Sequence, residues 1–244
     1  MIEAFDNFLS ILNEYWKPFI FWDGTEFSGL AVTLWILVLS LLIGFILALP
    51  LAIARVSKNR WISGPVWLFT YIFRGTPLYV QLLLIYSGLI SLDFIKNNDT
   101  LNSFFMSGYN CVVLALMLNT LAYTIEIFAG FIKSMPHGEV EAAYAYGMSK
   151  AKIYRRIILP SALRRSLPAY SNEVILMLHS TSLAFTATVP DILKVARDAN
   201  SATYLTFASY GTAALIYMVV SFSIVALFRM VERRALAFLA YEKK

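Results

Sequence analysis

The chain has 244 residues, of which 59% are hydrophobic, and its mean hydropathy is +0.67. Soluble domains are typically about 45–50% apolar, so this composition excludes a soluble domain and indicates an integral membrane protein. The formal charge of +5 bears on membrane topology before it bears on nucleic acid, and no nucleic-acid partner is expected. A single cysteine, Cys111, excludes an intrachain disulfide.

Residues 2–21 predict an amphipathic helix that lies on the membrane surface. Their apolar residues recur at helical spacing, but Glu3, Asp6, Glu14 and Lys17 interrupt any stretch long enough to cross. Residues 27–54 then carry no charged side chain over 28 positions, more than the roughly 20 that a spanning helix needs. The first membrane span is therefore predicted here.

Four further apolar stretches predict four more spans. The second follows a long apolar run that Arg74 divides, so residues 61–73 are interpreted as an approach to it rather than as a part of it. A polar loop at 91–108 and a short amphipathic link at 190–200 separate later spans. The predicted spans are residues 76–90, 109–132, 167–187 and 203–228.

The charges predict which side of the membrane each connection occupies. Segments 55–60, 133–165 and 229–244 hold 15 Lys or Arg and 4 acids, whereas 1–26, 91–108 and 190–200 hold 4 and 9. Basic residues favour the cytoplasm. We therefore expect an all-α membrane protein with five spans, a periplasmic N-terminal segment 1–26, a transmembrane domain 27–237 and a cytoplasmic tail 238–244.

The longest polar interruption, Glu139 to Pro168, predicts two short helices hinged at Gly147. The first would carry the alanine-rich run 141–145, and Gly147 stands where a helix end favours positive φ. Ser149 could cap a second helix that ends before Pro160. Seven residues here keep a fixed spacing: Glu141, Ala142, Ala143, Gly147, Ile157, Leu159 and Pro160.

This spacing resembles the cytoplasmic loop of membrane subunits of ATP-binding-cassette (ABC) importers. The resemblance implies the type I ABC importer permease fold and a loop, 139–168, on which two ATPase subunits dock. The alternative is an amphipathic surface helix with alanines placed by chance. Residues 147–152 lack the second glycine and the Lys-Ser/Thr pair of a phosphate-binding loop. ATP and Mg are therefore expected on the partner ATPase, with no cofactor, metal or enzymatic site in this chain.

Further segments resemble the polar amino acid permease branch of that family. Arg74–Gln81 is similar to its R-G-T-P-x-x-V-Q stretch, and Ala122–Phe128 to its third span. Residues 178–190 resemble the M-type subunits of permeases for histidine, lysine, arginine and ornithine. The signature residues that this resemblance assigns a structural role are Arg74, Gly75, Thr76, Pro77 and Glu126.

The resemblance implies a multi-pass subunit of the bacterial inner membrane that imports basic amino acids. Ala129 and His179-Ser180 depart from the residues common in the branch, which suggests a heterodimer with a second homologous membrane subunit. A periplasmic amino-acid-binding protein is the remaining expected partner. The alternatives left open are an importer for another polar amino acid such as glutamine, and an ATP-independent secondary transporter.

The fourth predicted span carries a polar stripe. Asn172 and His179, and likewise Glu173 and Ser180, are seven residues apart, so each pair lies within about 20° of one helix face. A carboxylate inside a membrane is costly unless it is paired or hydrated, which makes it a functional hypothesis. We expect Glu173 to receive the cationic side chain of the substrate and the other three to donate or accept hydrogen bonds.

Two alternatives concern the intramembrane acids. Glu173 could instead pair with Arg165 or with an arginine across the subunit interface. For Glu126 the structural interpretation is favoured, with a hydrogen bond to a neighbouring helix or a pair with Arg74, which is itself interpreted as an interface anchor.

Overall fold

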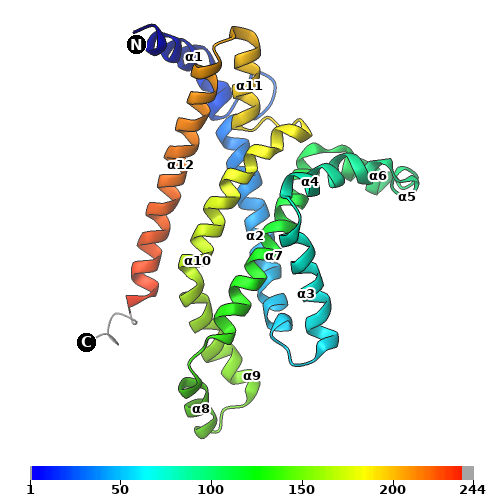
Figure 1. Cartoon of the computed structure of the whole chain (residues 1–244), viewed down its shortest axis with the longest axis vertical. Coiled ribbons are helices and arrows are strands. Elements are labelled where there is room, and N and C mark those ends of the chain that lie inside the picture. Colours follow the sequence, from blue (N-terminus) through cyan, green and yellow to red (C-terminus); the bar gives the residue numbers. More distant parts are fainter. Residues whose placement is uncertain (1, 238–244) are drawn as a thin grey trace.

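The computed structural model describes residues 2–237, and its long elements are all helices, as expected for an all-α chain. They run roughly along one long axis, with the start of α1 and the end of α12 toward opposite ends (Figure 1). Residue 1 and the predicted tail 238–244 lie outside the described residues. The helices, with π and 3-10 turns marked η, are α1 Ile2–Ile20, α2 Gly29–Arg55, α3 Arg60–Gly75, α4 Leu78–Leu83, η1 Leu84–Gly88, η2 Leu89–Ser91, α5 Asp93–Lys96, α6 Asp99–Met106, α7 Gly108–Lys133, α8 His137–Ala145, α9 Lys150–Ile153, η3 Tyr154–Ile158, α10 Leu159–Ser180, η4 Thr181–Ala187, α11 Ile192–Thr203 and α12 Thr206–Ala235.

The centre of the molecule is the pair α2 and α7, which pack closely over much of their lengths. Gly44, Ala48 and Ala52 recur every four residues on α2 and are buried. A Cβ at Gly44 would stand 2.9 Å from Thr120 Cγ2, so a larger residue would force Thr120 or the helices to shift. In a lipid environment small residues allow helix backbones to approach, and this stripe therefore sets the α2–α7 contact.

Three of the described helices are long and apolar enough to cross a membrane: α2, α7 and α12. They match the first, third and fifth predicted spans. The prediction for the second span was incomplete, because residues 60–75 form a full helix, α3, and not a short approach to that span. The pair α3 and 78–91 bends by 103° at its break, so it is either a broken span or a re-entrant loop.

The predicted fourth span lies within a longer helix. α10 begins at Leu159, eight residues before the predicted start, and passes into the 3-10 helix η4 after Ser180. It carries Arg164, Arg165, Glu173 and His179 and is not among the helices that pass the length and hydropathy test. Polar side chains on this helix are therefore expected to face protein, water or lipid headgroups and not the hydrocarbon core.

The segment predicted as a polar loop at 91–108 is largely helical. Asn98 caps α6 by accepting a hydrogen bond from the Leu101 N–H at 3.0 Å, and Phe105 is buried in the main core. The sequence prediction missed these helices because they are short. An Asn cap followed by one apolar face can support a helix of only two turns.

The N-terminal segment forms α1, as its periodicity predicted. Ile11 and Phe19 are buried against Ile192, Val195 and Ala208 of α11 and α12. The first and last long elements of the chain therefore meet at the end of the molecule opposite α8 and α9 (Figure 1).

Candidate functional site

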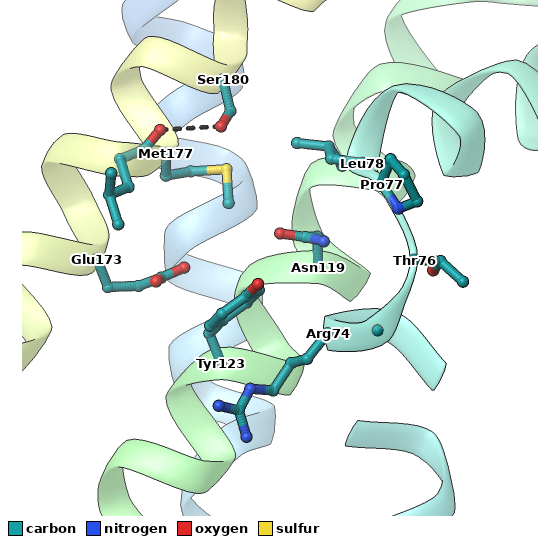
Figure 2. A pocket seen from close by; sticks show the side chains of 11 residues that line it. Arg74, Thr76, Pro77, Leu78, Asn119, Tyr123, Glu173, Met177 and Ser180 are labelled. Atoms are coloured by element: carbon teal, nitrogen blue, oxygen red, sulfur yellow. Dashed lines mark hydrogen bonds between the residues drawn. The ribbon is translucent and has the colours of Figure 1, made fainter. Parts of the chain in front are cut away.

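A cavity of about 430 Å³ lies beside the break between α3 and α4. The chain bends sharply there, and α7 and α10 supply the facing walls (Figure 2). The lining brings together the predicted signature segment and the predicted fourth span, which are about 100 residues apart in sequence. Its polar side chains are Arg74, Thr76, Asn119, Tyr123, Glu173 and Ser180.

A hydrogen-bond network joins the two sides of the break between α3 and α4 to each other and to α7. Gln81 Nε2 donates to Phe73 O at 2.8 Å, to Thr76 O at 3.0 Å and to Thr76 Oγ1 at 2.8 Å. Asn119 Nδ2 on α7 donates to Phe73 O at 3.3 Å and to Gln81 Oε1 at 3.1 Å. The last carbonyls of a helix such as α3 have no hydrogen-bond donor within the helix. These side-chain amides supply the missing hydrogen bonds at a depth in the membrane where water is scarce.

Glu173 and Ser180 line the cavity, whereas Asn172 and His179 do not. Glu173 is only 6% exposed, and its carboxylate points toward Asn119 and Tyr123 (Figure 2). Adjacent positions on a helix are about 100° apart, so the two seven-residue pairs occupy different faces. The His179 ring nitrogen Nε2 instead lies 3.1 Å from Ser221 Oγ on α12.

Arg74 lines the cavity, whereas the sequence was interpreted as placing it as an anchor at the membrane interface. Its guanidinium lies 5.2 Å from the centre of the Tyr123 ring, a cation–π contact. The cavity therefore has a basic group on the α3 wall and an acidic group on the α10 wall (Figure 2). Sequence reasoning gave no role to Asn119 or Tyr123, and the only signal for Asn119 was a polar residue within an apolar run.

Glu126 has a different environment. It accepts hydrogen bonds from Arg55 Nε at 2.6 Å and from Thr70 Oγ1 at 2.7 Å. The expected hydrogen bond to a neighbouring helix is thus present, and the ion-pair partner is Arg55 and not Arg74. The partner was missed because it lies 71 residues away, on α2.

The predicted coupling loop has the expected hinge. Gly147 follows the end of α8 at φ +71°, and the N–H groups of Gly147 and Met148 donate to Tyr144 O and Ala143 O at 2.9 and 3.1 Å. These two bonds form a Schellman motif, which uses a left-handed residue to satisfy the last carbonyls of a helix. Glu141, Ala142 and Gly147 are exposed, whereas Ala143 is buried against its own chain.

The second part of this loop differs from the prediction. Ser149 precedes α9 but makes no side-chain cap bond, and the helix does not end before Pro160. A π turn at Tyr154–Ile158 precedes the proline and leads directly into α10. Pro160 has no N–H to donate, and the wider turn lets the helix continue through it. Ile157, Leu159 and Pro160 are half-buried on this rod.

An ion pair joins the two parts of the loop. Arg165 Nη2 lies 3.0 Å from Glu139 Oε1, which ties α10 to α8. Arg165 is therefore engaged away from Glu173, and the alternative pair of those two residues is wrong for this chain. Within residues 2–237, Glu173 forms no salt bridge.

Comparison with known families decides what kind of chain this is. The model of the family described as "binding-protein-dependent transport system inner membrane component" matches residues 40–236. The chain belongs to this family. It is an inner-membrane permease subunit of an ABC importer, as its loop motif predicted. The described residues contain no group of three or more His, Cys, Asp or Glu side chains that could hold a metal.

Several proteins resemble the permease subunit over nearly all of its length. The histidine/lysine/arginine/ornithine transport system permease protein HisM of Escherichia coli K12 is 64% identical over 226 residues, 93% of this chain and 95% of the relative. The octopine transport system permease protein OccM of Rhizobium radiobacter is 41% identical over 89% of this chain and 86% of its own length. The predicted branch, the polar amino acid permeases, is confirmed.

Solved structures support the fold. A crystal structure of an amino acid ABC transporter with histidines has a TM-score of 0.80 and 33% identity to the permease subunit, covering 93% of this chain and 98% of its own. An inward-facing structure of the MetNI methionine ABC transporter has a TM-score of 0.70 at 16% identity, over 85% and 94% of the two chains. The second likeness bears on the fold alone.

Proposed function

We propose that the permease subunit carries basic amino acids, among them histidine, arginine, lysine and ornithine, through a path that includes the cavity. The observation that carries this proposal is a buried carboxylate, Glu173, facing a cavity whose opposite wall carries Arg74. The name of the relative in Escherichia coli, a permease protein for histidine, lysine, arginine and ornithine, favours the same class of substrate.

The chemistry of the cavity suits an amino acid with a cationic side chain. Glu173 would receive the ammonium or guanidinium group, and Arg74 would attract the α-carboxylate. Asn119 uses its nitrogen within the network, which leaves its oxygen to accept a hydrogen bond from the substrate. The volume of about 430 Å³ is within the range of about 300–1,000 Å³ that small-molecule sites occupy.

Asn172 and His179 enter this proposal differently from Glu173 and Ser180. Ser180 donates its hydroxyl hydrogen to Leu176 O at 2.9 Å, so its oxygen can accept from a substrate donor in the cavity. Asn172 and His179 are exposed on a neighbouring face. They would meet the substrate only where the path extends beyond this cavity.

The orientation that we propose has five crossings, the N-terminus outside and α8 and α9 in the cytoplasm. The third and fifth spans enclose α10, which would supply the fourth, and the bent pair of α3 and residues 78–91 would supply the second. The excess of Lys and Arg at the end that carries α8, α9 and the end of α12 supports this orientation.

The partners follow from this orientation. A second homologous membrane subunit would complete the path as a heterodimer, and a periplasmic binding protein would deliver the amino acid. Two ATPase subunits, which would hold ATP and Mg, would dock on residues 139–168. The exposed surface of Glu141, Ala142 and Gly147 is the contact that this docking would use.

The substrate class is tested with the assembled complex, reconstituted in proteoliposomes with its binding protein and ATP. We expect labelled arginine, lysine and histidine to enter and to compete with one another. Uptake of glutamine in preference to arginine would favour the alternative importer. Arginine uptake at full rate without ATPase would favour a secondary transporter and contradict the proposal.

The docking role is tested at Gly147, whose added Cβ would meet no atom within 4 Å in this chain. Gly147→Trp should therefore abolish coupled uptake through loss of the ATPase contact and through strain at φ +71°. Gly138→Trp on the same helix also meets open space, and its φ lies outside the left-handed range. We expect this control to transport normally, and equal uptake by both variants would contradict the docking role.

A further inference from the structure

A groove of about 800 Å³ lies between the start of α10 and the end of α12, away from the cavity. Leu227, Met230 and Val231 form its apolar floor and are 55%, 58% and 43% exposed. Arg164 of α10 and Arg234 of α12 flank it. Two helices thus bring two guanidinium groups to one end of an apolar strip that residues 2–237 leave exposed.

The geometry of α12 accounts for this arrangement. Positions 227, 230, 231 and 234 follow the i, i+3, i+4, i+7 pattern and so share one face of the helix. Arg234 therefore stands about one turn beyond Met230 and Val231, in line with the apolar floor. Arg164, in the second turn of α10, reaches the same end from the neighbouring helix.

The two arginines lack acidic partners in residues 2–237, since neither takes part in a salt bridge there. Glu232 is two residues from Arg234, about 200° round the helix, and so faces away from the groove. Glu139 of α8 is held by Arg165 at 3.0 Å, and Glu141 takes part in no salt bridge with either arginine within these residues. The positive charge at the mouth of the groove is therefore available to an anion.

We propose that this groove binds an anionic phospholipid of the cytoplasmic leaflet, with the phosphate between Arg164 and Arg234 and an acyl chain along Leu227, Met230 and Val231. The inference rests on the orientation proposed above, which places the end of α12 at the cytoplasmic surface. Guanidinium groups bind phosphate through paired hydrogen bonds, and basic pockets between membrane helices on that side suit anionic headgroups. A soluble phosphate would leave the apolar floor uncovered, which favours a lipid as the occupant.

The test uses the assembled complex in phosphatidylcholine nanodiscs that contain a small fraction of phosphatidylglycerol with a photoreactive acyl chain. After illumination, mass spectrometry should locate adducts at residues 227–231. The same label on phosphatidylcholine should give far fewer adducts there. Soluble glycerol phosphate in excess should not displace the labelled lipid.

Charge removal sharpens this test. Each of Arg164→Gln and Arg234→Gln should lower labelling at 227–231 by about fivefold, which corresponds to about 1 kcal/mol for each basic residue near the surface. Lys58→Gln with Arg60→Gln is the matched control, because both residues are exposed at the same end of the molecule but lie outside the groove. This control should label as the unaltered complex does.

Three results would overturn the proposal. Equal labelling by the two lipids would remove the role of charge, and an equal loss in the Lys58 and Arg60 control would show a general surface effect. Absence of adducts from 227–231 in the unaltered complex would show that a second subunit or another segment covers the strip. Arginine uptake measured in the same complex reports the proposed transport independently, so the two proposals can fail separately.

Discussion

Two carboxylates on the neighbouring helices α7 and α10, one half-buried and one buried, have opposite surroundings. Glu126, on α7, lies between Arg55 of α2 and Thr70 of α3, and both donate to it. Glu173, on α10, is 6% exposed, faces a cavity and forms no salt bridge within the described residues. Removing a partner from a paired carboxylate is costly, whereas a carboxylate with no ion-pair partner in its own chain is suited to bind a cation that comes and goes.

The largest effect is expected at the satisfied carboxylate. Arg55→Met leaves Glu126 with Thr70 alone and should lower the free energy of unfolding by about 3 kcal/mol, because an unpaired charge remains partly buried. Thermal denaturation of the purified complex measures this loss. Arg55→Met with Glu126→Leu removes both charges and should recover most of the stability. A single variant as stable as the unaltered chain would break the comparison.

The second prediction concerns the carboxylate in the cavity. Glu173→Gln should lower the rate of arginine uptake at low substrate concentration by about 10- to 100-fold, since a hydrogen bond to a charged group contributes about 1.5–3 kcal/mol. Its thermal stability should not fall, because the variant removes a buried charge that lacks an internal ion pair. Uptake in proteoliposomes and denaturation are measured on the same preparation.

The control for this prediction is Glu126→Gln, which changes the other carboxylate in the same way. It should lower stability and leave the apparent affinity for arginine unaltered. Transport of arginine at the unaltered rate by an assembled Glu173→Gln complex would dismiss a substrate role for Glu173.

A smaller effect is expected in the network that shapes the cavity. Gln81→Leu removes the donor to Phe73 and Thr76 and should cost about 1–2 kcal/mol of stability, with a raised KM for arginine because the wall beside Arg74 is no longer fixed. Tyr79→Phe is a suitable control, since this side chain is 45% exposed and lies outside the cavity. A loss of stability with no change in KM would show that the network does not influence substrate binding.

The smallest effect separates the two faces of α10. Ser180→Ala should lower arginine uptake by about fivefold, as loss of one hydrogen bond of about 1 kcal/mol implies. His179→Ala should change uptake by less than about twofold, because its ring contacts Ser221 and not the cavity. A larger loss in His179→Ala than in Ser180→Ala would place the path on the other face.

The long apolar spans could be predicted from the sequence because an uncharged run of 20 or more residues has few alternatives in lipid. Gly147 was also predictable, since a left-handed helix end strongly favours glycine. The contact between Arg55 and Glu126 and the network at Gln81 and Asn119 could not be predicted, because they join residues 38 to 71 positions apart. The helix through Pro160 was missed because a π turn leaves no simple sequence signal.

The uninterrupted helical run from Lys150 to Ser180 has a mechanical consequence. The Glu139–Arg165 ion pair holds this helical run near its middle, and Glu173 lies eight residues, about 12 Å, further toward Ser180. A side chain stands about 5–6 Å from a helix axis. A rotation of the helix by about 20° at the Glu139–Arg165 ion pair would therefore move the Glu173 carboxylate by about 2 Å. A rotation of the helix at the Glu139–Arg165 pair would thus reach the Glu173 wall of the cavity through a single piece of backbone.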